Sequence, residues 1–188
     1  MLNVLYEKFP EHVTVQGELF AIETDFREWI KFSELAGDDS VPWQTKAQLM
    51  LRWYTDGIPA DLEAAINALG DFLAARRLQP GNAEAEEERQ PKQAFSFEED
   101  AGCIYSAFVE CYGIDIQTVD YMHWWKFKTL FDNLPENTEI KQRMIYRTID
   151  VNSIKDKEER KRIRRIQKAI ALKKKIYLDD YEIGDVFA

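Results

Sequence analysis

The chain has only two histidines, and histidine is the side chain most often used for acid–base catalysis and metal binding near neutral pH. His12 stands at the start of a predicted hairpin, and His123 falls in the middle of a predicted helix. The sequence contains no C-x-x-C, H-E-x-x-H or H-x-E pattern, so neither histidine has a metal ligand at a suitable spacing. No nucleophile elbow supports a hydrolase. We expect His123 to be a partly buried structural residue.

The adjacent acidic residues also have structural explanations. Glu98, Glu99 and Asp100 lie where a helix is expected to begin, and the helix dipole favours negative charge at that end. Asp179 and Asp180 belong to an acidic tail. The chain has neither the G-x-x-x-x-G-K-[ST] loop nor the G-x-G-x-x-G loop of common nucleotide sites. We therefore predict that the protein is not an enzyme and needs no metal or cofactor.

The two cysteines and the ends of the chain indicate an intracellular setting. Cys103 and Cys111 are eight residues apart in a predicted helix, which separates their Cα atoms by about 12 Å, too far for a disulfide. We expect both to be reduced and buried. The first residues lack the pattern of a signal peptide, and no apolar run approaches the roughly 18 residues of a membrane span. A soluble cytoplasmic protein is the expectation.

Aromatic residues are concentrated in residues 121–131, within a helix predicted from about residue 118 to 133. Five apolar residues share one broad face of that helix: Val119, Met122, Phe127, Leu130 and Leu134. Other aromatic residues spread beyond it: Tyr121, Trp124, Trp125 and Phe131. A helix that is apolar on most sides is either central to the core or covered by a partner. We favour the core, but Trp and Tyr are common interface anchors, so these four residues are candidates for binding a partner.

Positive charge is concentrated in a helix predicted from about residue 155 to 174. Residues 155–175 include 11 basic and 3 acidic residues, a net charge of +8, whereas the rest of the chain carries −17. The helix has an apolar stripe made of Ile163, Ile166, Ile170 and Tyr177. The basic residues that we consider candidates for binding a partner are Arg160, Arg164, Arg165 and Lys168.

Several interpretations of this basic helix remain open. The simplest is a solvated face, partly neutralised by the acidic remainder of the chain. Nucleic acid is less compatible, because the net charge of −9 repels phosphates and no aromatic residue for base stacking is interleaved before Tyr177. An anionic membrane would require a bulkier apolar face. Among the functional alternatives, an acidic protein partner or self-association fits best.

The remaining patterns predict the elements that position these helices. Alternating apolar residues around Gln16 and Gly17 predict a β-hairpin over residues 12–24. Thr24 is the expected N-cap of the next helix, and Ser96 with Glu99 forms a capping box for a later one. Apolar periodicity predicts further helices. The predicted helical ranges outside the aromatic and basic segments are 24–36, 42–55, 59–75, 96–112 and 139–147.

A polar, acidic stretch divides the chain, since residues 76–93 contain two prolines and almost no apolar residues. We predict a mainly α-helical bundle in two lobes with a small N-terminal β-hairpin. Residues 1–78 would form the hairpin and the first lobe, and residues 79–94 a mobile acidic linker. Residues 95–178 would form the second lobe, and residues 179–188 an acidic tail.

Several short motifs are distinctive. They are FSFEEDA at 95–101, IYSAF at 104–108, YGID at 112–115, HWWKF at 123–127, LF at 130–131, YR at 146–147, IKDKEER at 154–160 and TDFR at 24–27. Together they resemble the bacteriophage gene-product-fifteen family over most of the chain, the linker and the acidic tail excepted. The HWWKF run is the most specific of them, because adjacent tryptophans are rare by chance.

The resemblance implies a component of a siphophage or prophage tail module that is similar to tail assembly chaperones. Such chaperones keep the long, apolar tape-measure protein soluble until tail-tube subunits displace them. The expected partners are the tape-measure protein, the tail-tube protein or other tail proteins, with a second copy of the chain as a further candidate. The expected location is the cytoplasm of the bacterial host. The alternatives are a structural tail or connector component of the virion and a nucleic-acid-binding regulator that uses the basic helix.

Overall fold

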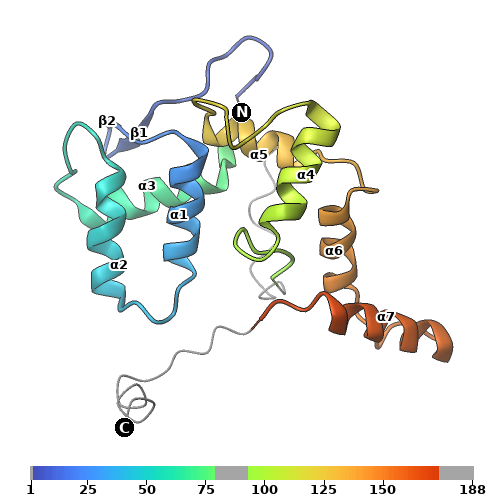
Figure 1. Cartoon of the computed structure of the whole chain (residues 1–188). Helices are drawn as coiled ribbons and strands as arrows, with labels where there is room; N and C mark the ends of the chain where they lie inside the picture. The colour runs from blue at the N-terminus through green and yellow to red at the C-terminus, as the bar shows by residue number, and fades with distance from the viewer. Residues whose placement is uncertain (1, 79–92, 174–188) are drawn as a thin grey trace, which may run out of the picture.

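The computed structural model describes residues 2–78 and 93–173, and this part of the chain is mainly α-helical (Figure 1). One β-hairpin precedes seven α-helices and two short 3-10 turns there. The predicted fold class, mainly α with a small N-terminal hairpin, is thus confirmed. Most of the predicted linker, residues 79–94, and all of the predicted acidic tail, residues 179–188, lie outside the described residues.

The hairpin pairs β1, His12–Val15, with β2, Glu18–Ala21, in antiparallel register. The two residues between the strands, Gln16 and Gly17, both have left-handed backbone angles, with φ of 49° and 89°. This is the geometry of the tight turn that matches the natural twist of a hairpin. Val13 and Val15 are buried on the face that packs against α3, so the hairpin is stabilised by the helices rather than by itself.

Three helices follow the hairpin: α1 Phe26–Ala36, α2 Trp43–Met50 and α3 Leu62–Ala74. The 3-10 turns η1 Leu51–Trp53 and η2 Arg76–Leu78 follow α2 and α3. The expected N-cap of α1 was wrong by one residue. Asp25 accepts a hydrogen bond from the Arg27 backbone N–H, whereas the hydroxyl of Thr24 lies 2.8 Å from that of Tyr121. The carboxylate of Asp61 caps α3, which therefore begins later than expected.

The second half contains α4 Ala101–Tyr112, α5 Trp124–Asp132, α6 Glu139–Thr148 and α7 Lys157–Ala169. The prediction for α5 was wrong at its start, because residues 116–118 form a turn and the chain is extended before Trp124. His123 is the N-cap of α5 and not a mid-helix residue. Its backbone forms a β-bridge with Asp25, which holds this segment against the start of α1.

The expected capping box before α4 forms only in part. The hydroxyl of Ser96 accepts a hydrogen bond from the Glu99 backbone N–H at 3.2 Å, as predicted. The helix nevertheless begins at Ala101, because the Ser96 backbone N–H donates to the carboxylate of Asp100 rather than to Glu99. The carboxylate of Glu99 instead accepts from the Lys173 backbone N–H. The box therefore lacks its reciprocal bond: Ser96 donates to a carboxylate four residues away, and Glu99 accepts from a residue 74 positions away.

Two further expectations differ from the structure. The basic helix α7 ends at Ala169, earlier than predicted, with residues 171–173 non-helical. Both cysteines are free, but neither is fully buried: Cys103 is partly buried, and Cys111 is exposed because it lies on the solvent side of the last turn of α4.

The hydrophobic core is continuous across the two halves of the sequence. Its buried members include Phe26, Trp29 and Phe72 from the first half and Phe108 and Phe127 from the second. Figure 1 shows the hairpin with α1–α3 on one side, α4, α6 and α7 on the other, and α5 between them. Because both halves contribute to one core, the two predicted lobes fold against each other.

Backbone hydrogen bonds reinforce this junction. The Phe26 N–H donates to the Met122 carbonyl at 2.9 Å, and the Trp124 N–H donates to the Thr24 carbonyl at 2.8 Å. The guanidinium of Arg27 donates to the carbonyls of Ile116 and Val119. The start of α1 and the segment before α5 are thus joined by backbone hydrogen bonds of the kind that pair antiparallel strands.

Candidate interaction surface

The tryptophans of α5 lie in the core. Trp124 is 4% exposed and Trp125 is 1% exposed. Their indole N–H groups donate to the carbonyls of Leu73 and Phe72, at 2.9 Å and 2.8 Å respectively, near the C-terminal end of α3. The last turn of a helix has carbonyls free to accept further hydrogen bonds, and the Phe72 carbonyl accepts from Trp125 in addition to the Ala75 backbone N–H. Both tryptophans therefore join α5 to α3 and offer no surface to a partner in this fold.

Phe131 is also buried, among Phe95, Phe97 and Phe127. Three of the four aromatic candidates thus lie in the core. Tyr121 is different, because it precedes α5 and is 52% exposed. Of the four, only Tyr121 can contact another molecule directly.

Tyr121 stands in an acidic environment. Its hydroxyl lies 2.8 Å from that of Thr24, at the junction between the two halves. Partial burial, together with the negative charges of Glu11, Asp25 and Glu23, raises the pKa of its phenol, although the bond to Thr24 opposes the shift. The side chain therefore stays a neutral, half-exposed aromatic group beside carboxylates, a suitable contact for a cationic side chain.

His123 has a structural role. Its Nδ1 accepts a hydrogen bond from the Trp125 backbone N–H at 3.0 Å and caps α5, so Nε2 carries the proton and donates to the Pro10 carbonyl at 3.0 Å. The ring stacks on Phe9. Burial lowers the pKa of His123, although its bond to Pro10 and the charge of Glu11 oppose the shift. Both nitrogens are occupied, which leaves neither for a metal or a substrate.

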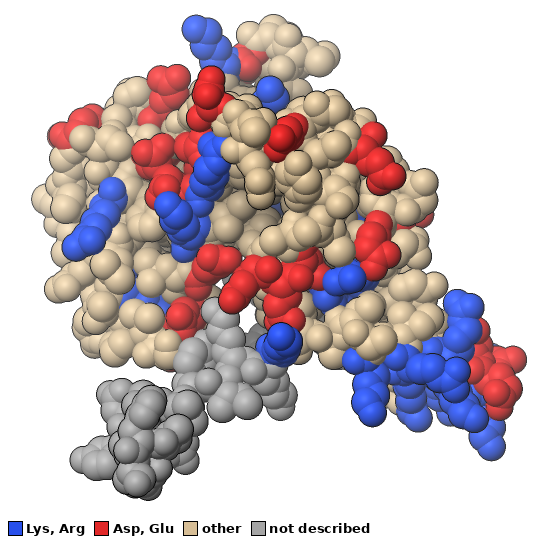
Figure 2. Space-filling view, in the orientation of Figure 1, with Lys and Arg blue, Asp and Glu red and all other residues tan. Residues whose placement is uncertain are grey.

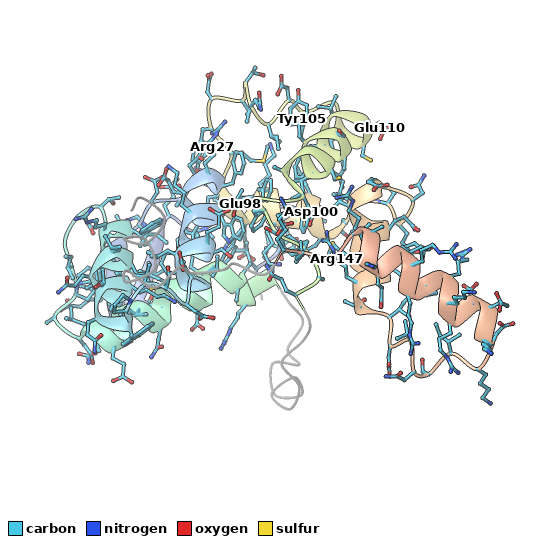
Figure 3. The ribbon with its side chains drawn as sticks, turned by 60° about the horizontal axis from the view of Figure 1, so that its bottom comes forward. Arg27, Glu98, Asp100, Tyr105, Glu110 and Arg147 are labelled. Atoms are coloured by element: carbon cyan, nitrogen blue, oxygen red, sulfur yellow. The ribbon has the colours of Figure 1, made fainter. Side chains whose placement is uncertain are left out.

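A buried ion cluster joins α4 to α6. The carboxylate of Asp100 is fully buried and accepts two hydrogen bonds from Arg147, at 2.6 Å and 3.0 Å, and one from Arg143 at 3.2 Å. Figure 3 shows Asp100 and Arg147 pointing toward one another. Burial alone would raise the pKa of Asp100, but the bonds from Arg147, the Ser96 N–H and Arg143 and the charge of Arg147 hold it below its usual value.

Arg147 also connects the end of the chain to this cluster. Its Nε donates to the Ile170 carbonyl at 2.7 Å, and its Nη1 donates to the Ala94 carbonyl at 3.1 Å. One guanidinium therefore joins α6 to the segment before α4 and to the residue that follows α7. The sequence offered no signal for this role, because Asp100 was already explained by the helix dipole.

Helix α7 is held on its apolar side. Ile163 is buried, and the side-chain amide of Gln167 donates to the carbonyls of Tyr146 and Ile149 at the end of α6. The guanidinium of Arg160, a candidate for binding a partner, is occupied by two hydrogen bonds to the Ile154 carbonyl. Arg160 therefore stabilises the start of α7 rather than standing free.

The opposite side of α7 carries the basic stripe, defined as Lys157, Lys161, Arg164, Arg165 and Lys168. At 100° per residue these side chains fall within an arc of about 100°, over about 17 Å of helix. All five are exposed, and none has a hydrogen bond or ion pair within residues 2–78 and 93–173. The stripe includes three of the four basic candidates and adds Lys157 and Lys161. Figure 2 shows its positive charge gathered where α7 projects from the body.

One comparison with known proteins decides the family. The family model described as "Bacteriophage Gp15 protein" matches residues 5–172. The chain belongs to this family. The match spans the hairpin and all of the described helices of this Gp15-family phage protein. No match was found among the curated proteins or among the solved structures.

The described residues of the Gp15-family chain lack two features that would point to particular functions. They contain no group of three or more His, Cys, Asp or Glu side chains that could hold a metal ion. Nor is any helix among them long and apolar enough to span a bilayer. The surfaces left for interaction in this part of the chain are the basic stripe, Tyr121 and scattered exposed apolar residues.

Proposed function

We propose that this phage protein acts in tail assembly as a non-catalytic, chaperone-like binder of the tape-measure protein. The observation that carries the proposal is the family match over residues 5–172, which agrees with the resemblance of its motifs to tail-module proteins. The host cytoplasm, where tails assemble, is the proposed location. The tail-tube protein and other tail proteins are further candidate partners.

The accessible surfaces suit this role. Large apolar side chains stand exposed in the first half, namely Leu19 (68%), Trp43 (59%), Ile58 (57%) and Leu62 (51%). Such side chains can cover an apolar helix of a partner by packing into its grooves. The basic stripe of α7 can add contacts to acidic residues of the same partner.

The expected strength of these contacts also suits a chaperone. Ion pairs between exposed side chains contribute little each and weaken as salt rises. A partner held by scattered apolar contacts and solvent-exposed charges can be released when a better-packed competitor arrives. Displacement by polymerising tail-tube subunits would be such a competition.

Co-expression with the tape-measure protein of the same gene cluster tests the proposal. We expect the tape-measure protein to remain in the soluble fraction and to co-purify with this chain. A variant with Trp43→Ser and Leu62→Ser should retain less of it, whereas the matched variant Gln44→Ser and Glu63→Ser, at neighbouring exposed positions, should behave as wild type. Failure of the wild-type chain to keep any tape-measure protein soluble would refute the proposal.

The main alternative is a structural tail or connector component. A chaperone is absent from the finished particle, whereas a structural component remains in it. Mass spectrometry of purified virions therefore separates the two functions. Stoichiometric amounts of this protein in virions would favour the structural one.

A further inference from the structure

The basic stripe faces away from the protein to which it belongs. Ile163, Ile166 and Ile170 lie on the opposite side of α7, and Ile163 is buried where α7 meets α6. Hydrogen bonds from Gln167 to the end of α6 and from Arg147 to the Ile170 carbonyl hold the helix in this orientation. The described acidic surface of the same chain therefore cannot reach the stripe unless α7 detaches.

The rest of the chain offers the complementary charge. Outside residues 155–175 it carries a net charge of −17, of which −11 belongs to the described residues, with 12 basic and 23 acidic side chains. Exposed carboxylates that have no ion pair or hydrogen bond within the described residues include Glu18, Glu34, Glu63, Glu98 and Glu110. Figure 2 shows acidic side chains distributed over the body while basic ones dominate α7. Each copy thus has a positively charged helix that projects from a negatively charged body.

We propose that the basic stripe of α7 binds the acidic body of a second copy of this chain. The acidic surface of one copy attracts the stripe of another, and this local attraction acts against the repulsion between two chains that each carry a net charge of −9. Two stripes cannot face each other, because like charges repel. The contact therefore joins the stripe to a different surface, either reciprocally in a two-fold pair or head to tail in a larger assembly.

Sedimentation velocity of the full-length protein over a concentration series tests the inference. At about 0.05 M NaCl, where screening is weak, we expect the average mass to rise with concentration, and at about 0.5 M NaCl we expect the monomer. The quadruple variant Lys161→Gln, Arg164→Gln, Arg165→Gln and Lys168→Gln should remain monomeric in low salt. All four side chains are exposed, so the variant should keep the wild-type circular dichroism spectrum.

The matched control changes four exposed basic residues elsewhere: Lys8→Gln, Lys31→Gln, Arg52→Gln and Lys126→Gln. It alters the net charge by the same amount and should associate as the wild type does. Equal loss of association in both variants would show a general charge effect and overturn the proposal. A wild-type monomer at every concentration in low salt would also overturn it, and would mean that the stripe is covered within its own chain or serves another partner.

A mixing experiment separates self-association from nucleic-acid binding. The quadruple variant retains its acidic body, so it should still accept the stripe of a wild-type copy and form mixed complexes in low salt. In parallel, a fluorescent DNA duplex is titrated with the wild-type protein. Stripe-dependent DNA binding without mixed protein complexes would overturn the inference. Because only this chain and a DNA probe are used, the result is independent of the proposed binding to the tape-measure protein.

Discussion

Asp100 and Arg147, 47 residues apart in the sequence, form a two-pronged ion pair at 2.6 Å and 3.0 Å. Asp100 is fully buried, and the Arg147 side chain is only 8% exposed. The same guanidinium reaches the carbonyls of Ala94 and Ile170. One arginine therefore contributes to the placement of both α6 and α7 against α4, together with Arg143 and Gln167.

Replacing Arg147 by Met should lower the free energy of unfolding by about 3–5 kcal/mol, because it leaves the buried carboxylate of Asp100 without its main partner. Urea denaturation followed by circular dichroism measures the loss. Arg165→Met is the control, since Arg165 is exposed on α7 and has no partner among the described residues. A loss from Arg147→Met as small as that of the control would contradict the assigned role.

The pH dependence of stability should reveal His123. Its pKa is lowered in the folded protein, so the unfolded chain binds more protons once the pH falls below the ordinary value of about 6.5. The free energy of unfolding should therefore decrease as the pH falls below about 6.5, by at most about 1.4 kcal/mol per pH unit from this group. Above that pH, His123 is neutral in both states, so its protonation should not affect the stability. Urea midpoints at several pH values above about 5 measure the effect.

His123→Asn should remove this part of the pH dependence, because an Asn side chain can still cap α5 but does not titrate. His12→Gln is the matched control, since His12 is exposed at the start of β1 and its ring makes no hydrogen bond, ion pair or aromatic contact within the described residues. If the profile of the His12 variant flattens instead, the assignment to His123 is incorrect.

Trp125→Ala should destabilise the fold by about 3–5 kcal/mol, because it opens a cavity between α5 and α3 and removes the bond to the Phe72 carbonyl. Tyr121→Ala should cost much less, because half of that side chain is already in solvent. Thermal unfolding compares the two variants. A Trp125→Ala protein as stable as the wild type would mean that this residue is not a core residue.

Two glycines at the ends of α4, Gly102 in its first turn and Gly113 just after its last residue, should respond in opposite directions to alanine. Gly113 ends the helix with φ of +62°, a conformation that costs a residue with a Cβ about 1–2 kcal/mol, so Gly113→Ala should destabilise. Gly102 lies within the helix with open space around it, so Gly102→Ala should stabilise by about 0.5–1 kcal/mol. Urea denaturation of both variants tests the pair, and a stabilising Gly113→Ala would rule out the left-handed cap.

Local sequence patterns were informative wherever one element's own residues decide its structure. Apolar spacing predicted the helices that became α1, α3 and α6, and alternation around Gln16 and Gly17 predicted the hairpin. The charge asymmetry located the basic helix, and short motifs pointed to the family that the comparison confirmed. These signals are local, because helix periodicity, turn geometry and charge depend on residues close together in the chain.

Only the tertiary structure decided which of these residues face a partner. A core helix and an interface helix would show the same apolar periodicity over residues 121–131. Trp124 and Trp125 lie in the core because they pack against α3 and donate hydrogen bonds to its carbonyls. The predicted start of α5 was too early, because His123 forms a β-bridge with Asp25. A pairing between residues so far apart in the chain produces no periodic pattern in the sequence. Arg160 and Arg165 are the same residue type on one helix, yet their surroundings differ. The guanidinium of Arg160 donates to the Ile154 carbonyl, whereas Arg165 is exposed to solvent. Long-range contacts made these choices, and their free energy depends on groups that sequence spacing does not bring together.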